Sequence, residues 1–161
     1  MPAQREADDI RILASVYQKL VSELPYPPPE CGGILGCKDN TICEIWIDSR
    51  PQVNDALVYE PDIKGINHQI YQWQKNGVRF CGLFHSHIAE EETLSGDDIT
   101  YIRRIVRAIP RDYGQLLFPV VIPNKKVILY YANGQDNDLY FSIGEIELVR
   151  DKGRKEASYS G

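Results

Sequence analysis

The sequence predicts a mixed α/β protein in which a central mixed sheet is flanked by helices. Two hydrophobic patterns recur along the 161 residues. Apolar residues three and four positions apart indicate amphipathic helices, and short apolar runs indicate strands. Because both patterns run through the chain, one layered arrangement is expected. We expect residues 1–149 to form a single domain, and the polar residues 150–161 to be a disordered tail.

Three segments have the periodicity of helices. They are residues 10–24, the segment between Asp62 and Gly77, and residues from about 96 to 109. Asp8 or Asp9 is placed to cap the first helix, and Pro25 to end it. Asp62 is a suitable N-cap for the second helix, and Gly77 a suitable stop.

The strands are expected in the remaining apolar segments. They are residues 31–37, 41–48, a short segment near 56–60, 78–87, 115–122, 126–132 and 139–149. Lys-Asp-Asn at 38–40 has the composition of a turn, so the strands before and after it should pair. Residues 78–87 are apolar on both alternating faces over most of their length, which favours a central strand.

Composition excludes several classes of protein. The 23 acidic residues exceed the 18 basic ones, whereas a nucleic-acid-binding protein usually has a basic surface. The N-terminus lacks the basic and apolar regions of a signal peptide. No apolar run approaches the roughly 20 residues that span a bilayer. We therefore expect a cytoplasmic protein with no nucleic-acid or membrane partner.

Four cysteines have two possible interpretations: Cys31, Cys37, Cys43 and Cys81. Without an export signal, reduced and mostly buried thiols are expected rather than disulfides. A structural zinc site of four cysteines is the alternative, but such sites usually contain closely spaced pairs that this chain lacks.

His85 and His87 lie at the end of the predicted central strand. Side chains two residues apart on a strand point to the same face, so both imidazoles can reach one ion. The pair alone is equally compatible with a structural coincidence. Seven residues after His87 comes Ser95, and Asp98 follows in the first turn of the predicted helix.

The spacing of Ser95 and Asp98 is that of a capping box, with Ser95 as N-cap. Such a cap would hold the Asp98 carboxylate on the first helical turn. The loop at 88–94 is long enough to bring this turn over the two histidines. Two histidines and a carboxylate, with a fourth position left to water, compose a catalytic zinc site. Spacing alone does not identify the base that this water needs.

A family resemblance supplies that base. A glutamate before Cys-Gly-Gly-Ile-Leu-Gly, then His-Ser-His, seven residues and Ser-x-x-Asp, resembles the JAMM (MPN-type) metallopeptidase signature. The matching residues are Glu30, His85, Ser86, His87, Ser95 and Asp98. A chance match to the His-to-Asp part is expected in about one chain in several thousand of this length. The likeness covers about residues 8–149, and one departure is Ile88, where members usually carry a loop-stiffening proline.

The resemblance implies an MPN/cytidine-deaminase-like layered fold and zinc-dependent hydrolysis of an amide bond. His85, His87 and Asp98 would hold Zn²⁺, and Glu30 would be the general base. Ser95 would donate a hydrogen bond to the oxyanion. Ser95 would then be both helix cap and catalytic residue, two roles that compete for one hydroxyl.

The resemblance also implies a substrate. The scissile bond would follow the C-terminal tail of a ubiquitin-like (β-grasp) protein, as in compact prokaryotic members of the family. One alternative is a hydrolase that releases a small amino acid or amide from a carrier protein. Another is a non-catalytic scaffold, but such scaffolds typically lose the glutamate or the metal ligands. The sequence indicates neither the pathway nor the oligomeric state.

Other polar residues have simpler interpretations. His68 lies off the apolar stripe of its helix and is expected at the surface. Asp97 points about 100° away from Asp98 on a helix, where it complements the helix dipole. Glu90–Glu92 are expected to form a solvated loop face, or else to steer a basic substrate. The arginines near the end of the third helix suit its dipole, or an acidic partner: Arg103, Arg104, Arg107 and Arg111.

Overall fold

The predicted mixed α/β class is confirmed by a computed structural model of the chain. The structure describes residues 3–4, 10–48, 61–108, 115–133, 139–141 and 146–151. In these residues the strands form one mixed sheet with the order β1-β10-β9-β6-β5-β3-β4-β2-β11, while β7 pairs with β5 and β8. The sheet therefore includes strands from both ends of the chain.

The described elements have the following bounds. The helices are α1 (Ala14–Ser22), α2 (Ile63–Lys75) and α3 (Gly96–Ala108). The strands are β1 (Ala3–Gln4), β2 (Arg11–Leu13), β3 (Gly32–Lys38), β4 (Thr41–Ile47), β5 (Arg79–Ser86), β6 (Gln115–Leu117), β7 (Val120–Ile122), β8 (Lys126–Ile128), β9 (Tyr130–Asn133), β10 (Leu139–Phe141) and β11 (Glu147–Val149). None of the helices in this part of the chain has the length and apolar character needed to cross a membrane.

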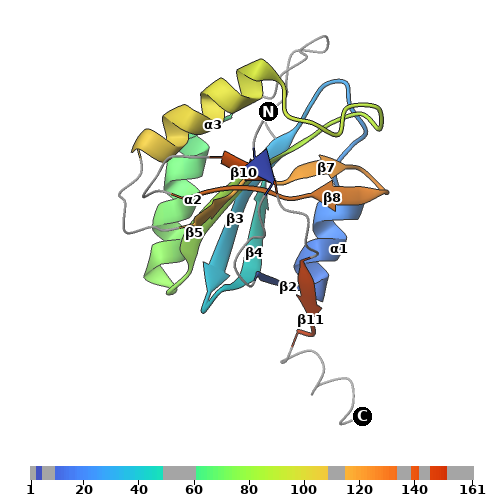
Figure 1. Cartoon of the computed structure of the whole chain (residues 1–161). Coiled ribbons are helices and arrows are strands. Elements are labelled where there is room, and N and C mark those ends of the chain that lie inside the picture. The colour runs from blue at the N-terminus through green and yellow to red at the C-terminus, as the bar shows by residue number, and fades with distance from the viewer. Residues whose placement is uncertain are drawn as a thin grey trace, which may run out of the picture.

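Helices cover both faces of the sheet. α1 buries Val16 and Leu20 in the core on one face. α2 and α3 bury Trp73, Ile102 and Val106 in a second core on the other face. Figure 1 shows α1 on one side of the sheet and α2 and α3 on the opposite side. The sheet is thus the middle of three layers, as helices with one apolar face require.

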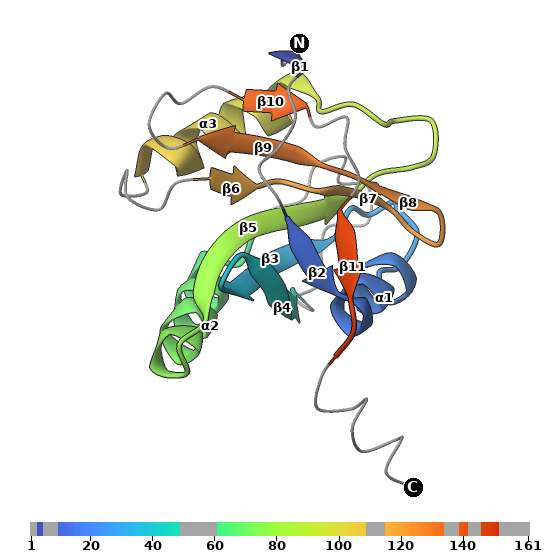
Figure 2. The ribbon, with the colours of Figure 1, turned by 60° about the horizontal axis from the view of Figure 1, so that its bottom comes forward.

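β5 is the central strand that residues 78–87 were expected to form. It pairs antiparallel with β3 on one side, and parallel with β6 and β7 on the other. Figure 2 shows β5 curving through the sheet beside β3 and β6. β5 therefore has neighbours on both sides, and its C-terminal end carries His85 and Ser86.

The strand pair and the second helix were predicted correctly. β3 and β4 form an antiparallel pair around the turn at Asp39 and Asn40, both of which have positive φ. Asp62 caps α2 by accepting a hydrogen bond from the Gly65 N–H at 3.1 Å. Ile63 was expected to share the apolar face of this helix with Ile66 and Trp73, but it is exposed. The strand expected near 56–60 lies outside the described residues.

The first helix is shorter than predicted. It begins after Leu13, which occupies the N-cap position without a side-chain cap, and not after Asp8 or Asp9, which lie outside the described residues. The preceding residues form β2, which pairs in parallel with β4 and β11. The Asp151 carboxylate accepts a hydrogen bond from the Ser15 N–H at 3.1 Å. A main-chain donor in the first turn of α1 is therefore paired with a residue 136 positions later.

The last three predicted strands are each divided in two. Residues 115–122 become β6 and β7, and 126–132 become β8 and most of β9. Pro119 lies between β6 and β7, and it has no N–H to donate to a ladder. The predicted strand 139–149 becomes β10 and β11, which lie toward opposite ends of the strand order, beside β9 and β2. Of the predicted tail, only residues 150–151 lie within the described part of the chain.

The four cysteines are free thiols. Cys31, Cys37 and Cys81 are buried, and Cys43 is half-buried. The expectation of reduced, mostly buried cysteines is therefore confirmed. Among the described residues, which include all four, no cysteine belongs to a group with metal-ligand spacing. The alternative of a cysteine zinc site has no support in the structure.

Gly33 allows the main chains of β3 and β4 to approach closely. A Cβ atom at this position would lie 2.0 Å from the Trp46 carbonyl oxygen and 2.8 Å from Phe84 Cζ. We expect Gly33→Ala to reduce the free energy of unfolding by about 1–3 kcal/mol or more. The control is Gly96→Ala, where a Cβ would meet nothing within 4 Å. Urea denaturation of both variants provides the test, and equal stabilities would contradict the expectation.

Candidate metal centre

Strand pairing brings Glu30 to the two histidines. Gly32 of β3 pairs with His85 of β5, and the Ser86 N–H donates to the Cys31 carbonyl at 2.8 Å. Cys31 thus opposes Ser86, and the same antiparallel register places the preceding residue, Glu30, opposite His87. Glu30 Oε2 lies 3.5 Å from His87 Nε2. A residue 55 positions earlier in the sequence than His85 thus reaches the same site.

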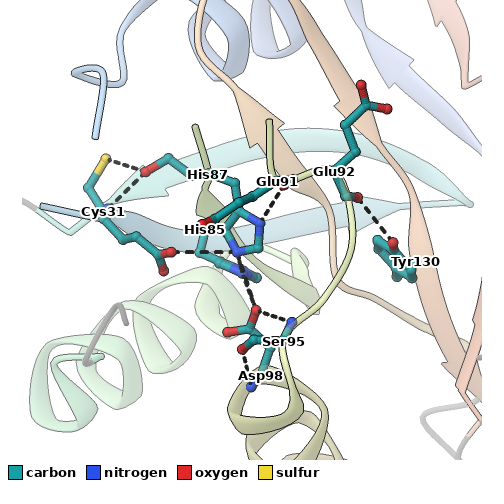
Figure 3. Close-up of polar contacts among 10 residues, drawn as sticks. Cys31, His85, His87, Glu91, Glu92, Ser95, Asp98 and Tyr130 are labelled. Carbon is teal, nitrogen blue, oxygen red and sulfur yellow. Dashed lines mark hydrogen bonds and ion pairs between the residues drawn. The ribbon is translucent and has the colours of Figure 1, made fainter. Parts of the chain in front are cut away.

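Four side chains converge where β5 ends beside α3. The candidate ligand atoms of Glu30, His85, His87 and Asp98 all lie within 4.8 Å of one another. The relative exposures of these side chains are 9%, 12%, 3% and 7% in the same order. Figure 3 shows the His85 and His87 rings and the Asp98 carboxylate directed toward a common point. The structure therefore brings together four of the five predicted site residues as one nearly buried donor group.

The spacing of three donor atoms fits one metal ion. His85 Nε2 and His87 Nε2 are 2.9 Å apart, and they lie 3.4 Å and 3.2 Å from Asp98 Oδ2. Donor atoms at about 2.0–2.1 Å from a tetrahedral zinc ion are about 3.3–3.4 Å apart. Both distances to Asp98 are close to this value. The histidine pair is somewhat shorter, at a separation where one ring nitrogen can donate to the other. Two imidazoles and one carboxylate are also donors that zinc accepts.

The Glu91 carbonyl determines which nitrogen of His87 faces the site. His87 Nδ1 lies 2.8 Å from the Glu91 main-chain oxygen, and this nitrogen must donate because a carbonyl only accepts. In the neutral ring, Nε2 is then left with the lone pair that a metal requires. Metal-bound histidines usually have such a partner on the second nitrogen. The Glu91 carbonyl was not identified from the sequence, because it is a main-chain group in a loop.

The capping box predicted from the sequence fixes Asp98. The Asp98 N–H donates to Ser95 Oγ at 3.0 Å, and the Ser95 N–H donates to Asp98 Oδ2 at 3.0 Å. Oδ2 is also the oxygen nearest to the two histidines. One hydrogen bond from the main chain therefore orients the oxygen atom that would bind a metal.

The electrostatics of the group favour positive charge. Burial raises the pKa of the Asp98 carboxyl, whereas hydrogen bonds from His85 and His87 lower it. The lowering is the larger effect, so the pKa of Asp98 is well below the usual range. Burial lowers the pKa of His87, whereas Asp98, the Glu91 carbonyl and the charge of Glu30 raise it, and the net direction is upward. A site with two buried carboxylates stabilises a cation, whether a proton or a metal ion.

Two tyrosines position the loop between His87 and Ser95. The Tyr130 hydroxyl donates to the Glu92 carbonyl at 3.1 Å, and the Ala89 N–H donates to the Tyr26 hydroxyl at 2.9 Å. Figure 3 shows the Tyr130 contact beside the site. The loop brings the first turn of α3 to the histidines. It does so with Ile88 at the position where members of the JAMM family, which the sequence resembles, usually carry proline. This role of Tyr26 and Tyr130 was not predicted from the sequence.

The structure shows the capping role of Ser95. Its hydroxyl oxygen accepts the Asp98 N–H as a helix cap. A serine hydroxyl has two lone pairs and also one proton to donate. Capping uses a lone pair, whereas an oxyanion would take the proton. Ser95 itself is exposed. The cap therefore leaves the hydroxyl proton unused, and the catalytic role of Ser95 stays a prediction.

The residues assigned simpler roles are not among the four donors. His68, Asp97 and Glu90–Glu92 are exposed, as expected. Glu92 also forms a surface ion pair with Lys126 at 2.8 Å. Three arginines of α3 are exposed: Arg103, Arg104 and Arg107. Arg111 lies outside the described residues, and nothing in the structure tests whether these arginines bind a partner.

Comparisons with known proteins identify the fold but not the family. No protein-family model and no curated protein matches the chain. The solution structure of a protein from Desulfitobacterium hafniense is similar, with a TM-score of 0.58, 18% identity, and coverage of 88% of this chain and 94% of that one. A solution structure from Salinibacter ruber has a TM-score of 0.54 and 15% identity, and covers 87% and 92% of the respective chains.

A third similar structure is the crystal structure of a JAB1/MPN domain protein from Archaeoglobus fulgidus. It has 15% identity, covers 88% of this chain and 99% of that one, and has a TM-score of 0.46. This value is too low to support an argument. The two solution structures show that the fold of this chain recurs in other proteins.

Proposed function

We propose that this chain is a zinc-dependent hydrolase of the JAMM (MPN-type) metallopeptidase kind, which cleaves an amide bond. The observation that supports this most is the group of Glu30, His85, His87 and Asp98, whose donor atoms lie within 4.8 Å of one another. These are the residues that match the family signature in the sequence. A non-catalytic scaffold is disfavoured because the glutamate and all three ligands are present together.

Each member of the group has a proposed role. His85, His87 and Asp98 would hold the ion, since their donor atoms have the spacing of one tetrahedral site. Bound zinc lowers the pKa of water to about 7 and polarises a carbonyl. Glu30 would take the proton from the attacking water and pass it to the leaving amine. Its carboxylate contacts His87 but is not needed to complete the three-ligand set.

Ser95 would stabilise the charge that develops on the carbonyl oxygen. Its hydroxyl proton is not used by the helix cap, and its position at the start of α3 is fixed by the capping box. A donor that is already oriented costs little reorganisation during the reaction. Ser95 can therefore donate to the oxyanion while it continues to cap α3.

The proposed substrate is a ubiquitin-like protein joined through its C-terminal glycine to another group. The four side chains are 12% exposed or less, so only a thin segment of substrate can reach them. A glycine-ended tail presents a carbonyl without a neighbouring Cβ. The tail has no free edge of β5 to pair with, because β5 already has a strand on each side.

The substrate proposal predicts a difference between a folded substrate and its tail. We expect kcat/KM to be about tenfold or more lower for the isolated tail peptide, because binding energy from the folded body is lost. The two probes are a ubiquitin-like β-grasp protein carrying a fluorescent amine on its terminal glycine, and its tail peptide carrying the same amine. Initial cleavage rates measure kcat/KM for each.

Two controls make this comparison informative. Cleavage must disappear in the presence of a zinc chelator, and it must decrease in Glu30→Gln. Equal kcat/KM values for the two probes would contradict recognition of the folded body. They would instead favour a hydrolase that releases small amides from a carrier protein.

A further inference from the structure

Ser86 lies between the two histidines but faces the opposite side of the sheet. Side chains alternate along a strand, so Ser86 points toward the α1 side while His85 and His87 point toward α3. Its neighbour Phe84 belongs to the core on the α1 side, which agrees with this alternation. Ser86 is fully buried, with 0% exposure. A buried hydroxyl at this point needs hydrogen-bond partners within the protein.

Both partners of Ser86 belong to Cys31, the residue after Glu30. The Cys31 N–H donates to Ser86 Oγ at 3.0 Å, and Ser86 Oγ lies 3.5 Å from the Cys31 sulfur. Two dashed lines at Cys31 in Figure 3 mark these contacts. In return, the Ser86 N–H donates to the Cys31 carbonyl at 2.8 Å. Cys31 and Ser86 are therefore joined by hydrogen bonds in both directions.

One of these bonds departs from a regular ladder. Residues exchanging two bonds in an antiparallel pair normally do so through their main-chain groups. Here the Cys31 N–H goes to the Ser86 side chain, while the reverse bond uses the main chain. The exchange occurs where β3 has not yet begun, one residue before Gly32. Ser86 thus fixes the chain at the position immediately after Glu30.

We propose that Ser86 is the positioning residue for Glu30, holding the Cys31 amide so that the Glu30 carboxylate faces the metal centre. This inference rests on the proposed function. Cys31 opposes Ser86 on one face of the sheet, and Glu30 opposes His87 on the other face, at 3.5 Å. Fixing the first pair therefore fixes the second. Ser86 itself touches none of the reacting atoms.

The first test is Ser86→Ala, assayed with the ubiquitin-like protein carrying a fluorescent amine. We expect kcat to fall by about 10- to 100-fold, because small misplacements of a catalytic group have effects of this size. KM should stay within about twofold, since the substrate-binding surface is unchanged. Zinc content, measured by elemental analysis, should remain one per chain, because Ser86 is not a ligand.

Two further variants locate the effect. In a Glu30→Gln background, Ser86→Ala should lower kcat by less than about twofold more, because a positioning residue has no effect once its target is removed. Cys31→Ala keeps the amide but removes the sulfur. If Cys31→Ala lost as much kcat as Ser86→Ala, the proposal that Ser86 acts through the Cys31 amide would be wrong.

A measurement that does not depend on turnover completes the test. Amide hydrogen exchange, followed by NMR, should be about tenfold faster or more at Cys31 in Ser86→Ala, with exchange in β3 unchanged. Ser86→Thr keeps the hydroxyl. Of the two variants, the one with slower hydrogen exchange at the Cys31 amide should therefore have the higher kcat. Unchanged exchange at Cys31, or an unchanged kcat, would overturn the positioning role.

The outcomes separate this inference from the proposed function. A wild-type protein that binds zinc and cleaves the probe, together with an equally active Ser86→Ala, refutes the inference alone. A wild-type protein that binds no zinc, or cleaves no amide, refutes the proposed function and the positioning role with it.

Discussion

Replacing Glu30 with glutamine is expected to reduce kcat by about 10²–10⁴-fold, the usual contribution of a general acid–base group. Glutamine has nearly the same shape but cannot take a proton from water. Zinc should remain bound at one ion per chain, because His85, His87 and Asp98 already supply three donors at suitable spacing. The measurement combines initial rates on an amide substrate with elemental analysis of the same preparation.

Glu90→Gln is the matched control for this variant. Glu90 follows His87 by three residues and has the same side chain, but it is exposed in the loop. Its replacement should leave kcat and zinc content at the wild-type level. If Glu30→Gln retained near-normal kcat, Glu30 would not be the base. If it lost its zinc, Glu30 would instead belong to the ligand set.

The sequence was sufficient for elements defined by local signals. The capping box at Ser95 and Asp98 and the N-cap at Asp62 were both predicted and are both formed. In each case the hydrogen bond joins residues three positions apart, so nearby residues carry the information. The turn at Asp39 and Asn40 is local in the same sense.

Elements that depend on distant partners were predicted less well. Residues 11–13 form β2 because β4 and β11 lie on either side of it, yet their apolar spacing also fits a helix. Tertiary pairing outweighs local preference in such short segments. The division of the predicted strand 115–122 had a visible signal in Pro119. This residue lies between β6 and β7 in the sequence and cannot donate a ladder hydrogen bond.

The candidate site shows the same distinction. The two histidines could be placed on one face from their spacing alone, and Asp98 from its cap. Glu30 could be assigned only through the family resemblance, because its place opposite His87 depends on the register of β3 against β5. A register between strands separated by a whole helix is not visible in a single sequence. The same reason explains why no role was assigned to Ser86 before the structure.

Replacing both His85 and His87 with alanine is expected to abolish zinc binding. The two changes remove both nitrogen donors and leave carboxylates, which bind zinc weakly without imidazole partners. Elemental analysis of protein purified without added metal should give one zinc ion per wild-type chain and almost none for the double variant. Amide hydrolysis should disappear together with the metal.

Loss of zinc should also be visible in stability. An ion that binds only the folded state stabilises it by about 2.7 kcal/mol when its free concentration is 100 times its Kd. Addition of zinc should therefore raise the Tm of the chelator-treated wild type but not that of the double variant. This readout is independent of any substrate, so it tests the ligand assignment even if the proposed reaction is wrong.

His68→Ala is the matched control for the ligand assignment. His68 is the remaining histidine of the chain; it is exposed on α2 and is not among the four converging side chains. Its removal should change neither zinc content nor the Tm increase caused by zinc, because an isolated surface imidazole is a weak ligand. Full zinc occupancy in the His85→Ala, His87→Ala variant would place the ion elsewhere. The group around Asp98 would then have to be explained as a hydrogen-bonded polar cluster that holds the end of β5 against α3.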